Sequence, residues 1–436
     1  MLLNAPFASP AGAAGAICLT ALSWINLEMF VRRHVYPAFI KKENSLDFGI
    51  EVRSWSRGAS TFTCIVAIVL TVSGCAGADD APATRSVGTL RFIGEQRIAY
   101  RKDFEATTVG GISGIDYNPT SQTWALISDD RSDINPARLY TATLAYDMGK
   151  FSSITLLGTT FLRQEDGTVY PNRQRHATQG GEIPDFEAVR FDPIDGSVWY
   201  ASEGDRALAH DPFVKQATRA GSYMSRLPVP AMFKMFPTQD VGSRNNLTFE
   251  GLTFARDGRS IWVSMEGPIY QDGSVPTPVY GAVSRITQYD RSGKMLRQVA
   301  YPIDAIPSPP AAGKLADNGV SEMLAVDDHR FLMVERAAVQ GPDSVYANYI
   351  RIYEMDISGA TDISSIQSLR NRNYVPTRKR LVLDLNQLNL PRLDNIEGIA
   401  WGPKLANGND SLVLVSDDNF NPAQVTQFLA FEVLPK

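Results

Sequence analysis

Five copies of one unit constrain this chain more than any other feature of its sequence. The copies are GISGIDYNPTSQTWALISDDRS (111–132), DFEAVRFDPIDGSVWYASEGDR (185–206), TFEGLTFARDGRSIWVSMEGPI (248–269), VSEMLAVDDHRFLMVERAA (320–338) and NIEGIAWGPKLANGNDSLVLVSDDNF (395–420). Each holds two short apolar runs around a turn, which is typical of a β-hairpin. Anchored at Ser113, Glu187, Glu250, Glu322 and Glu397, they recur every 74, 63, 72 and 75 residues. Such repetition predicts an array of similar structural units.

Further strand-like runs follow most of the hairpins. They lie at 138–144, 153–162, 284–290, 295–303, 349–357, 379–385 and 426–433. The last copy is one strand short, and TLRFIGEQRIAY (89–100) could supply that strand. Four strands per repeat, with an N-terminal strand closing the last sheet, predict an all-β propeller of five blades. Six blades stay open, because each step exceeds the ~40–50 residues of a compact blade. The stretch 207–245 shows no strand pattern and could hide a blade or form a loop over one face.

Acidic residues recur at two positions of the repeat. In a propeller the first strand of each blade lines the central channel and the second runs antiparallel to it. The start of the first strand and the end of the second therefore share one face, the mouth of the channel. The residues expected there are Glu187, Glu250, Glu322 and Glu397 at strand starts, and Asp129, Asp130, Glu203, Glu266, Glu335, Asp417 and Asp418 at strand ends.

So many carboxylates at close range cannot all stay ionised unless something neutralises them. Arg131, Arg206 and Arg336 each lie within two residues of an acid cluster and could do so. Calcium could also do so, because it prefers carboxylate, carbonyl and water oxygens. A purely architectural role, with each carboxylate bonding turn amides, is an alternative for any single acid. Gly251 and Gly398 after the Glu are expected to permit close backbone approach.

Composition excludes several functional classes. The chain has 436 residues and a net charge of −5, and the part after residue 75 carries −7, which disfavours nucleic acid and anionic membranes as partners. Cys18, Cys64 and Cys75 precede the repeats, so the repeat region can hold no disulfide, thiolate zinc site or cysteine nucleophile. None of the four histidines recurs in the repeat, and no nucleophile elbow, P-loop or zinc-protease motif occurs.

The N-terminal region contains targeting signals. RSWSRGASTFTCIVAIVLTVSGC (53–75) has the basic, apolar and small-residue parts of a signal peptide. Its end, Val72 to Cys75, resembles a bacterial lipoprotein signal in which Cys75 becomes lipidated. Residues 1–52 are interpreted as an over-extended start or a membrane segment, 76–88 as a polar tether, and 89–436 as the propeller. The expected location is the bacterial envelope, periplasmic or extracellular, with a lipid anchor.

The repeats resemble one known family. GGISGIDYNP, DFEAVRFDP, NLTFEGLTF, SEMLAVDDHRFLMVERA and NIEGIAWGP occur in the order found in the bacterial phytase-like proteins, described by an esterase-like activity of phytase. The resemblance covers about 109–433. It implies a β-propeller hydrolase of phosphoric or carboxylic esters that depends on calcium held in an acidic mouth.

The resemblance also implies roles for individual residues. Glu250 and Glu397 would be catalytic. Arg131, Arg206 and Arg336 would bind the substrate, a small ester, phosphorylated or not. Metal ligands would come from Asp129, Glu187, Glu203, Glu250, Glu266, Glu322, Glu335, Glu397 and Asp417. The alternative is a non-catalytic envelope propeller that binds a ligand or protein partner. The protein is expected to be a monomer in either case.

Overall fold

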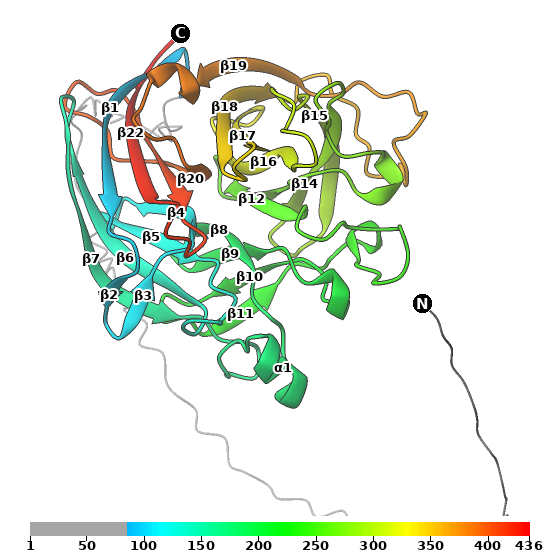
Figure 1. The fold of residues 1–436 in the computed structure, drawn as a ribbon, viewed down its shortest axis with the longest axis horizontal. Helices are drawn as coiled ribbons and strands as arrows, with labels where there is room; N and C mark the ends of the chain where they lie inside the picture. The colour runs from blue at the N-terminus through cyan, green and yellow to red at the C-terminus, as the bar shows by residue number, and fades with distance from the viewer. Residues whose placement is uncertain (1–84) are drawn as a thin grey trace, which may run out of the picture. The chain divides into compact units, whose positions relative to one another are not determined.

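The computed structural model describes residues 85–436, which fold into five four-stranded antiparallel blades around a central channel (Figure 1). The innermost strands are β4 (Ile112–Asn118), β8 (Phe186–Phe191), β12 (Phe249–Phe254), β16 (Ala316–Ala325) and β20 (Asn395–Trp401). They neighbour one another in that order, and β20 returns to β4. The predicted five-bladed all-β propeller is confirmed.

The remaining elements build the blades outward from these strands. The second strands are β5 (Thr123–Ser128), β9 (Val198–Ser202), β13 (Ser260–Met265), β17 (Arg330–Gln340) and β21 (Ser411–Asp417). The outer strands are β6 (Arg138–Tyr146), β7 (Phe151–Phe161), β10 (Phe213–Ala217), β11 (Tyr223–Arg226), β14 (Ala282–Asp290), β15 (Met295–Ile303), β18 (Tyr346–Asp356), β19 (Arg378–Asp384), β22 (Thr426–Leu434) and β1 (Thr89–Ile98). A small hairpin (β2, Lys102–Phe104; β3, Thr107–Val109), the helix α1 (Arg173–Gln179) and the 3₁₀ turns η1 (Arg206–Leu208), η2 (Ala231–Phe233), η3 (Tyr270–Asp272) and η4 (Leu385–Leu388) complete the elements.

The N-terminal strand closes the ring. Strand β1 pairs antiparallel with β22, from Thr89 opposite Leu434 to Ile98 opposite Thr426. An ion pair between Arg91 and Glu432, 2.5 Å apart, fixes the same junction from the side chains. The last blade therefore has the order β1-β22-β21-β20. The prediction that residues 89–100 complete this blade is confirmed.

The stretch 207–245, for which a hidden blade and a loop were both open, is neither. It contains β10 and β11, the two outer strands of the second blade. Sequence patterning misses them because they are only five and four residues long, and Lys215 and Gln216 are buried within β10. The possibility of a sixth blade in this stretch is thereby removed.

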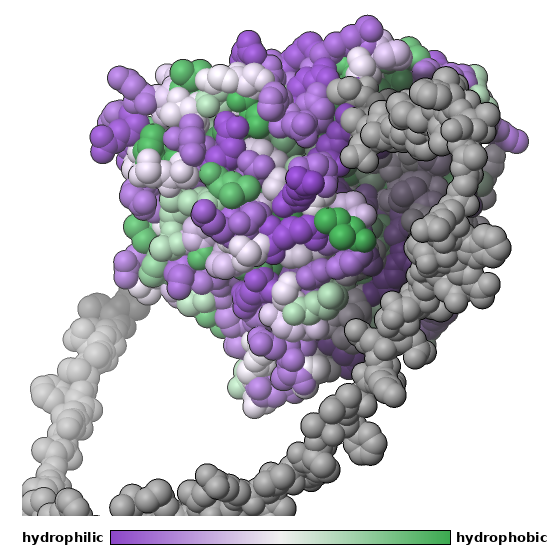
Figure 2. Space-filling model, turned by 180° about the vertical axis from the view of Figure 1, so that it is seen from behind, coloured by the Kyte–Doolittle hydropathy of each residue, from purple (hydrophilic) through white to green (hydrophobic). Residues whose placement is uncertain are grey.

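The hydrophobic core lies between neighbouring blades rather than at the centre of the ring. Five clusters each combine residues of two adjacent blades, as where Trp262 of the third blade meets Phe331 of the fourth at 5.0 Å between ring centroids. On the face seen from behind, hydrophobic residues outside the grey atoms are scattered among hydrophilic ones (Figure 2). Burial between sheets leaves the channel free for polar residues.

A buried ion pair, Arg190 with Glu322, lies at the centre of the ring, among the innermost strands. The Arg190 Nη2 lies 2.7 Å from the Glu322 carboxylate, and the two side chains are 3% and 0% exposed. Arg190 also donates to the carbonyls of Ile115, Val189, Met323 and Ile399, while Glu322 accepts from the Leu252 amide. These partners belong to all five innermost strands. One ion pair thus ties every blade to the axis.

The predicted segments 1–52 and 53–75, with Cys75, lie outside the described residues. Residues 85–436 lie within one compact unit of the chain. Within the described part, no helix has both the length and the apolar character needed to cross a bilayer.

Candidate metal centre

A β-bulge in each innermost strand sets the direction of one side chain. The register between first and second strands shifts at Ser113, Glu250, Ser321 and Glu397, and across Glu187–Ala188 in the second blade. A bulge inserts an unpaired residue and re-aims its side chain. The repeated Glu therefore stands where the strand bends at the mouth. Added Cβ atoms at the next residues, Gly251 and Gly398, would meet the neighbouring blade at 2.7 Å and 3.1 Å, which fits the predicted close approach.

Eight acidic residues gather at the mouth, and we call them the carboxylate ring. They are Asp129, Asp185, Glu187, Glu203, Glu250, Glu266, Glu397 and Asp417. All but Asp185 were predicted from the repeat. Asp185 was missed because it lies outside the paired strand, two residues before Glu187. Polar residues two positions before Glu250 and Glu397, Thr248 and Asn395, are the signal that could have found it.

Burial raises the pKa of every member of the ring, and neighbouring carboxylates raise most of them further. The pKa of Glu266 rises to about 8 and that of Asp185 to about 7, although Arg336 and Arg131 respectively lower them. The pKa values of Glu187 and Glu250 lie well above the usual range, and burial is the main cause for both. The next cause is the charge of Glu250 for Glu187, and the charge of Glu203 for Glu250. The ring therefore holds protons near neutral pH unless a cation replaces them.

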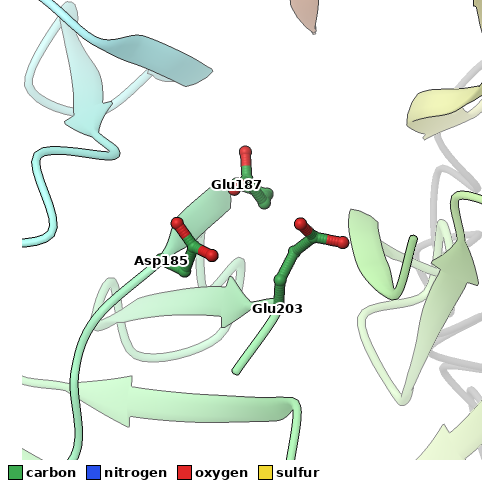
Figure 3. A group of neighbouring side chains, drawn as sticks. All are labelled: Asp185, Glu187 and Glu203. Carbon is green, nitrogen blue, oxygen red and sulfur yellow. The ribbon is translucent and has the colours of Figure 1, made fainter. Parts of the chain in front are cut away.

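Two groups of three carboxylates converge closely enough to share a cation. One is Asp185, Glu187 and Glu203, whose ligand oxygens lie within 4.8 Å of one another (Figure 3). The second group is Glu203, Glu250 and Glu266, with the same spacing, so Glu203 belongs to both. Glu203 also accepts a 2.6 Å hydrogen bond from the Thr248 amide, which fixes it between the second and third blades.

Glu187 and Glu250 are the least satisfied members of the two triads, because Asp185 pairs with Arg131, Glu203 accepts from Thr248 and Glu266 pairs with Arg336. The side chains of Glu187 and Glu250 are 8% and 4% exposed, and no donor within residues 85–436 bonds either carboxylate. Buried carboxylates normally accept hydrogen bonds, so these two require either a proton or a cation. They are the best-placed ligands of the two groups.

Two predicted ring members lie elsewhere. In the fourth blade the bulge falls at Ser321, so Glu322 takes the place that Gly251 and Gly398 hold in their blades. Glu322 consequently points down the channel to Arg190. Glu335 is 0% exposed and accepts from the Tyr301 hydroxyl, the Asp304 amide and Lys379, toward the outer strands. The alignment of the fourth repeat from the sequence was therefore wrong by one residue.

The same shift places Arg336 in the ring. In the strand pairing, Glu335 stands opposite Val320 as Met265 stands opposite Phe249. The next residue, Arg336, therefore occupies the position that Glu266 holds in the third blade, and a guanidinium replaces a carboxylate there. Its Nη2 lies 3.1 Å from Glu266 and 3.7 Å from Glu397. Burial alone would lower the pKa of Arg336, but these carboxylates outweigh it and raise the pKa.

The other two predicted arginines differ in position. Arg131 lies at the edge of the ring, 3.4 Å from Asp185 and 3.3 Å from Asp205. Arg206 stacks on Tyr270 at 4.7 Å and donates to the Gln239 carbonyl, so its guanidinium is held by loop residues rather than by the ring.

Two further acids at the predicted mouth have architectural roles. Asp130 accepts from the amides of residues 133–135 and from Arg138. Asp418 accepts from the amides of Gly111 and Phe420 and from the Thr426 hydroxyl. Carboxylates at the mouth thus divide into those that brace turns and those that converge.

A cleft of about 790 Å³ opens beside the ring. Glu266, Arg336 and Glu397 form its inner wall. The outer walls come from the tip of the β17–β18 hairpin, the segment 392–395 and the β21–β22 connection. A ligand in this cleft would contact the Glu203–Glu250–Glu266 group through Glu266.

The chain is similar in sequence to known proteins. The family described as "Phytase-like: Esterase-like activity of phytase" matches residues 107–420. An "Uncharacterized secreted protein" of Arthroderma benhamiae is 27% identical over 139 residues, which is 30% of this chain and 27% of that protein. The match therefore spans about a quarter of the fungal protein.

Solved structures overlap with the chain only loosely. A member of the DUF4221 family from Bacteroides vulgatus has 9% identity and a TM-score of 0.35, covering 80% of this chain and 99% of that one. The catalytic domain of an α-L-arabinofuranosidase from Coprinopsis cinerea has 10% identity and a TM-score of 0.36, covering 80% and 98%. Overlaps this loose say nothing about activity.

Proposed function

Because this chain belongs to the phytase-like family, we propose that it is an extracytoplasmic, calcium-dependent phosphoesterase whose active site is the carboxylate ring and the adjoining cleft. The secreted relative and the signal peptide predicted at 53–75 support the location. The observation that carries the proposal is the pair of carboxylate triads sharing Glu203, each with one buried ligand that no donor satisfies.

The residues present suit calcium. Both triads consist of carboxylates alone, the oxygen ligands that hard divalent cations prefer, and no sulfur or imidazole is among them. Asp185, Glu187, Glu203, Glu250 and Glu266 would hold the cation, with Glu203 positioned to contact a second one. Bound calcium would neutralise phosphate oxygens and acidify a coordinated water.

The chain's own residues would divide the remaining work. Arg336 lines the cleft and can bind a phosphate oxygen through its guanidinium, the geometry that arginine offers to phosphate. Glu397 also lines the cleft, and burial raises its pKa, which favours a role in proton transfer. Glu250 is assigned to the cation rather than to proton transfer.

Calcium titrated into metal-stripped protein should bind, and Glu250→Gln should weaken that binding at least about tenfold. A tenfold change in affinity corresponds to about 1.36 kcal/mol, and we expect the loss of a charged ligand to cost at least this much binding free energy. Isothermal calorimetry measures the affinity, and p-nitrophenyl phosphate hydrolysis on the same samples measures turnover.

The matched control is Glu165→Gln, which removes an exposed carboxylate outside the ring. It should leave calcium affinity and turnover unchanged. Binding without turnover would make calcium a structural brace. No binding would contradict the proposal and favour a non-catalytic propeller that binds a partner.

Replacing Arg336 with Gln should move two affinities in opposite directions. Removing a positive charge 3.1 Å from Glu266 should tighten calcium binding, while phosphate should bind more weakly because its guanidinium partner is gone. Calorimetric titration of calcium, then of inorganic phosphate into the calcium-loaded protein, measures both. If both affinities fall together, Arg336 braces the ring and does not bind the substrate.

A further inference from the structure

The outer walls of the cleft are rich in side-chain amides. Six of its lining residues are Asn246, Asn348, Asn395, Asn419, Asn421 and Gln424. No hydrogen bond within residues 85–436 engages the side chains of Asn246, Asn348 or Asn419. Each amide offers both donors and an acceptor. A wall of this kind matches a ligand whose groups also donate and accept, as hydroxyls do.

An exposed aromatic side chain stands in the same walls. Tyr346, at the start of β18, lines the cleft and is 45% exposed. Asn348 follows two residues later on the same strand, so both side chains are on one face of β18. A flat apolar ring beside amides offers surface to the C–H face of a sugar ring and hydrogen bonds to its hydroxyls.

The charges of the cleft limit how many phosphates a ligand can carry. Four acids line it, Glu266, Asp317, Asp394 and Glu397, against two arginines. One of these, Arg392, is paired with Asp394 at 2.7 Å and also donates to the Ala423 carbonyl. The second arginine, Arg336, lies at the inner wall beside Glu266 and Glu397, so it is already partly neutralised. With calcium bound, the site can neutralise one phosphate group but not a dense array of them.

We infer that the substrates are sugar or polyol esters carrying a single phosphate, with the hydroxylated alcohol against Tyr346 and the amides and the phosphate toward Arg336 and Glu266. The inference rests on the proposed phosphoesterase function and adds the chemical class of its leaving group. A site that hydrogen-bonds substrate hydroxyls rejects analogues that lack them, because its polar groups are then left unpaired.

The test compares three substrates with the calcium-loaded protein: glucose 1-phosphate, p-nitrophenyl phosphate and phytate. Glucose 1-phosphate should have the highest kcat/KM and phytate the lowest. Asn348→Ala should lower the ratio of kcat/KM for glucose 1-phosphate over p-nitrophenyl phosphate by about fivefold, the worth of one hydrogen bond. Tyr346→Ala should lower the same ratio, mainly through KM.

The matched control is Tyr280→Ala, which removes a 74% exposed tyrosine that does not line the cleft. It should leave the ratio unchanged. Phytate as the best substrate, or a ratio insensitive to Asn348 and Tyr346, would overturn the inference while leaving the phosphoesterase in place. If none of the three is hydrolysed, calorimetric titration of glucose 1-phosphate decides: binding weakened by Asn348→Ala upholds the sugar site, and no binding overturns it.

Discussion

Replacing Arg190 with Met should lower the free energy of unfolding by about 3–5 kcal/mol, the typical cost of removing one partner of a buried ion pair. The variant would leave Glu322 0% exposed without its countercharge, and four strand carbonyls would lose their donor. Because those carbonyls and Glu322 belong to different blades, the loss should loosen the ring at its axis. Urea unfolding followed by tryptophan fluorescence measures the change.

Two further variants show whether the charge or the geometry matters. Arg190→Lys keeps the charge but offers three donors on one nitrogen, so it should recover only part of the loss. Arg97→Met breaks an exposed pair with Glu95 and should cost less than about 1 kcal/mol. A cost below 1 kcal/mol for Arg190→Met would show that the pair does not hold the blades together.

The metal-stripped protein should lose stability as the pH rises from about 4 to 8. The pKa of Asp185 is raised to about 7 and that of Glu266 to about 8, against unfolded values near 4. Within this window the folded state binds more protons than the unfolded state, so the free energy of unfolding falls with pH. The lowered pKa of His210 acts in the opposite sense, but only up to about pH 6.5.

Saturating calcium should remove most of this slope, because the cation takes the place of the protons. At a calcium concentration 100 times Kd it should add about 2.7 kcal/mol at pH 8. Thermal unfolding by circular dichroism at several pH values, with chelator or with calcium, gives both results. Glu266→Gln should flatten the slope in chelator, whereas Glu165→Gln should not. A flat profile in chelator would mean that the ring stays ionised without a cation.

The sequence predicts the architecture because each blade repeats the same hairpin, and the N-terminal strand 89–100 matched the missing position. Residues 213–226 escaped prediction because their strands are short and their buried Lys215 and Gln216 break the apolar pattern. Tertiary contacts with Tyr170 and Glu182 satisfy Lys215, and no local signal reveals those partners.

The candidate site was predictable where residue type and backbone register agree, as at Glu187, Glu250 and Glu397. In the fourth blade they disagree, since matching Glu to Glu selects Glu322 while the hydrogen-bond register selects Ser321. That shift moves Glu335 out of the ring and brings Arg336 in. The cleft beyond the ring could not be predicted, because its walls come from connections that follow no repeat.

The pairing of β1 with β22 joins the first described strand to the last. During synthesis β1 emerges first among the described strands, and its partner is made more than 320 residues later. The ring can close only when nearly the whole domain is available, so folding depends on contacts of very high sequence separation and should be slow. A chain that cannot complete its fold early stays competent for translocation as an unfolded polypeptide, in agreement with the proposed extracytoplasmic location.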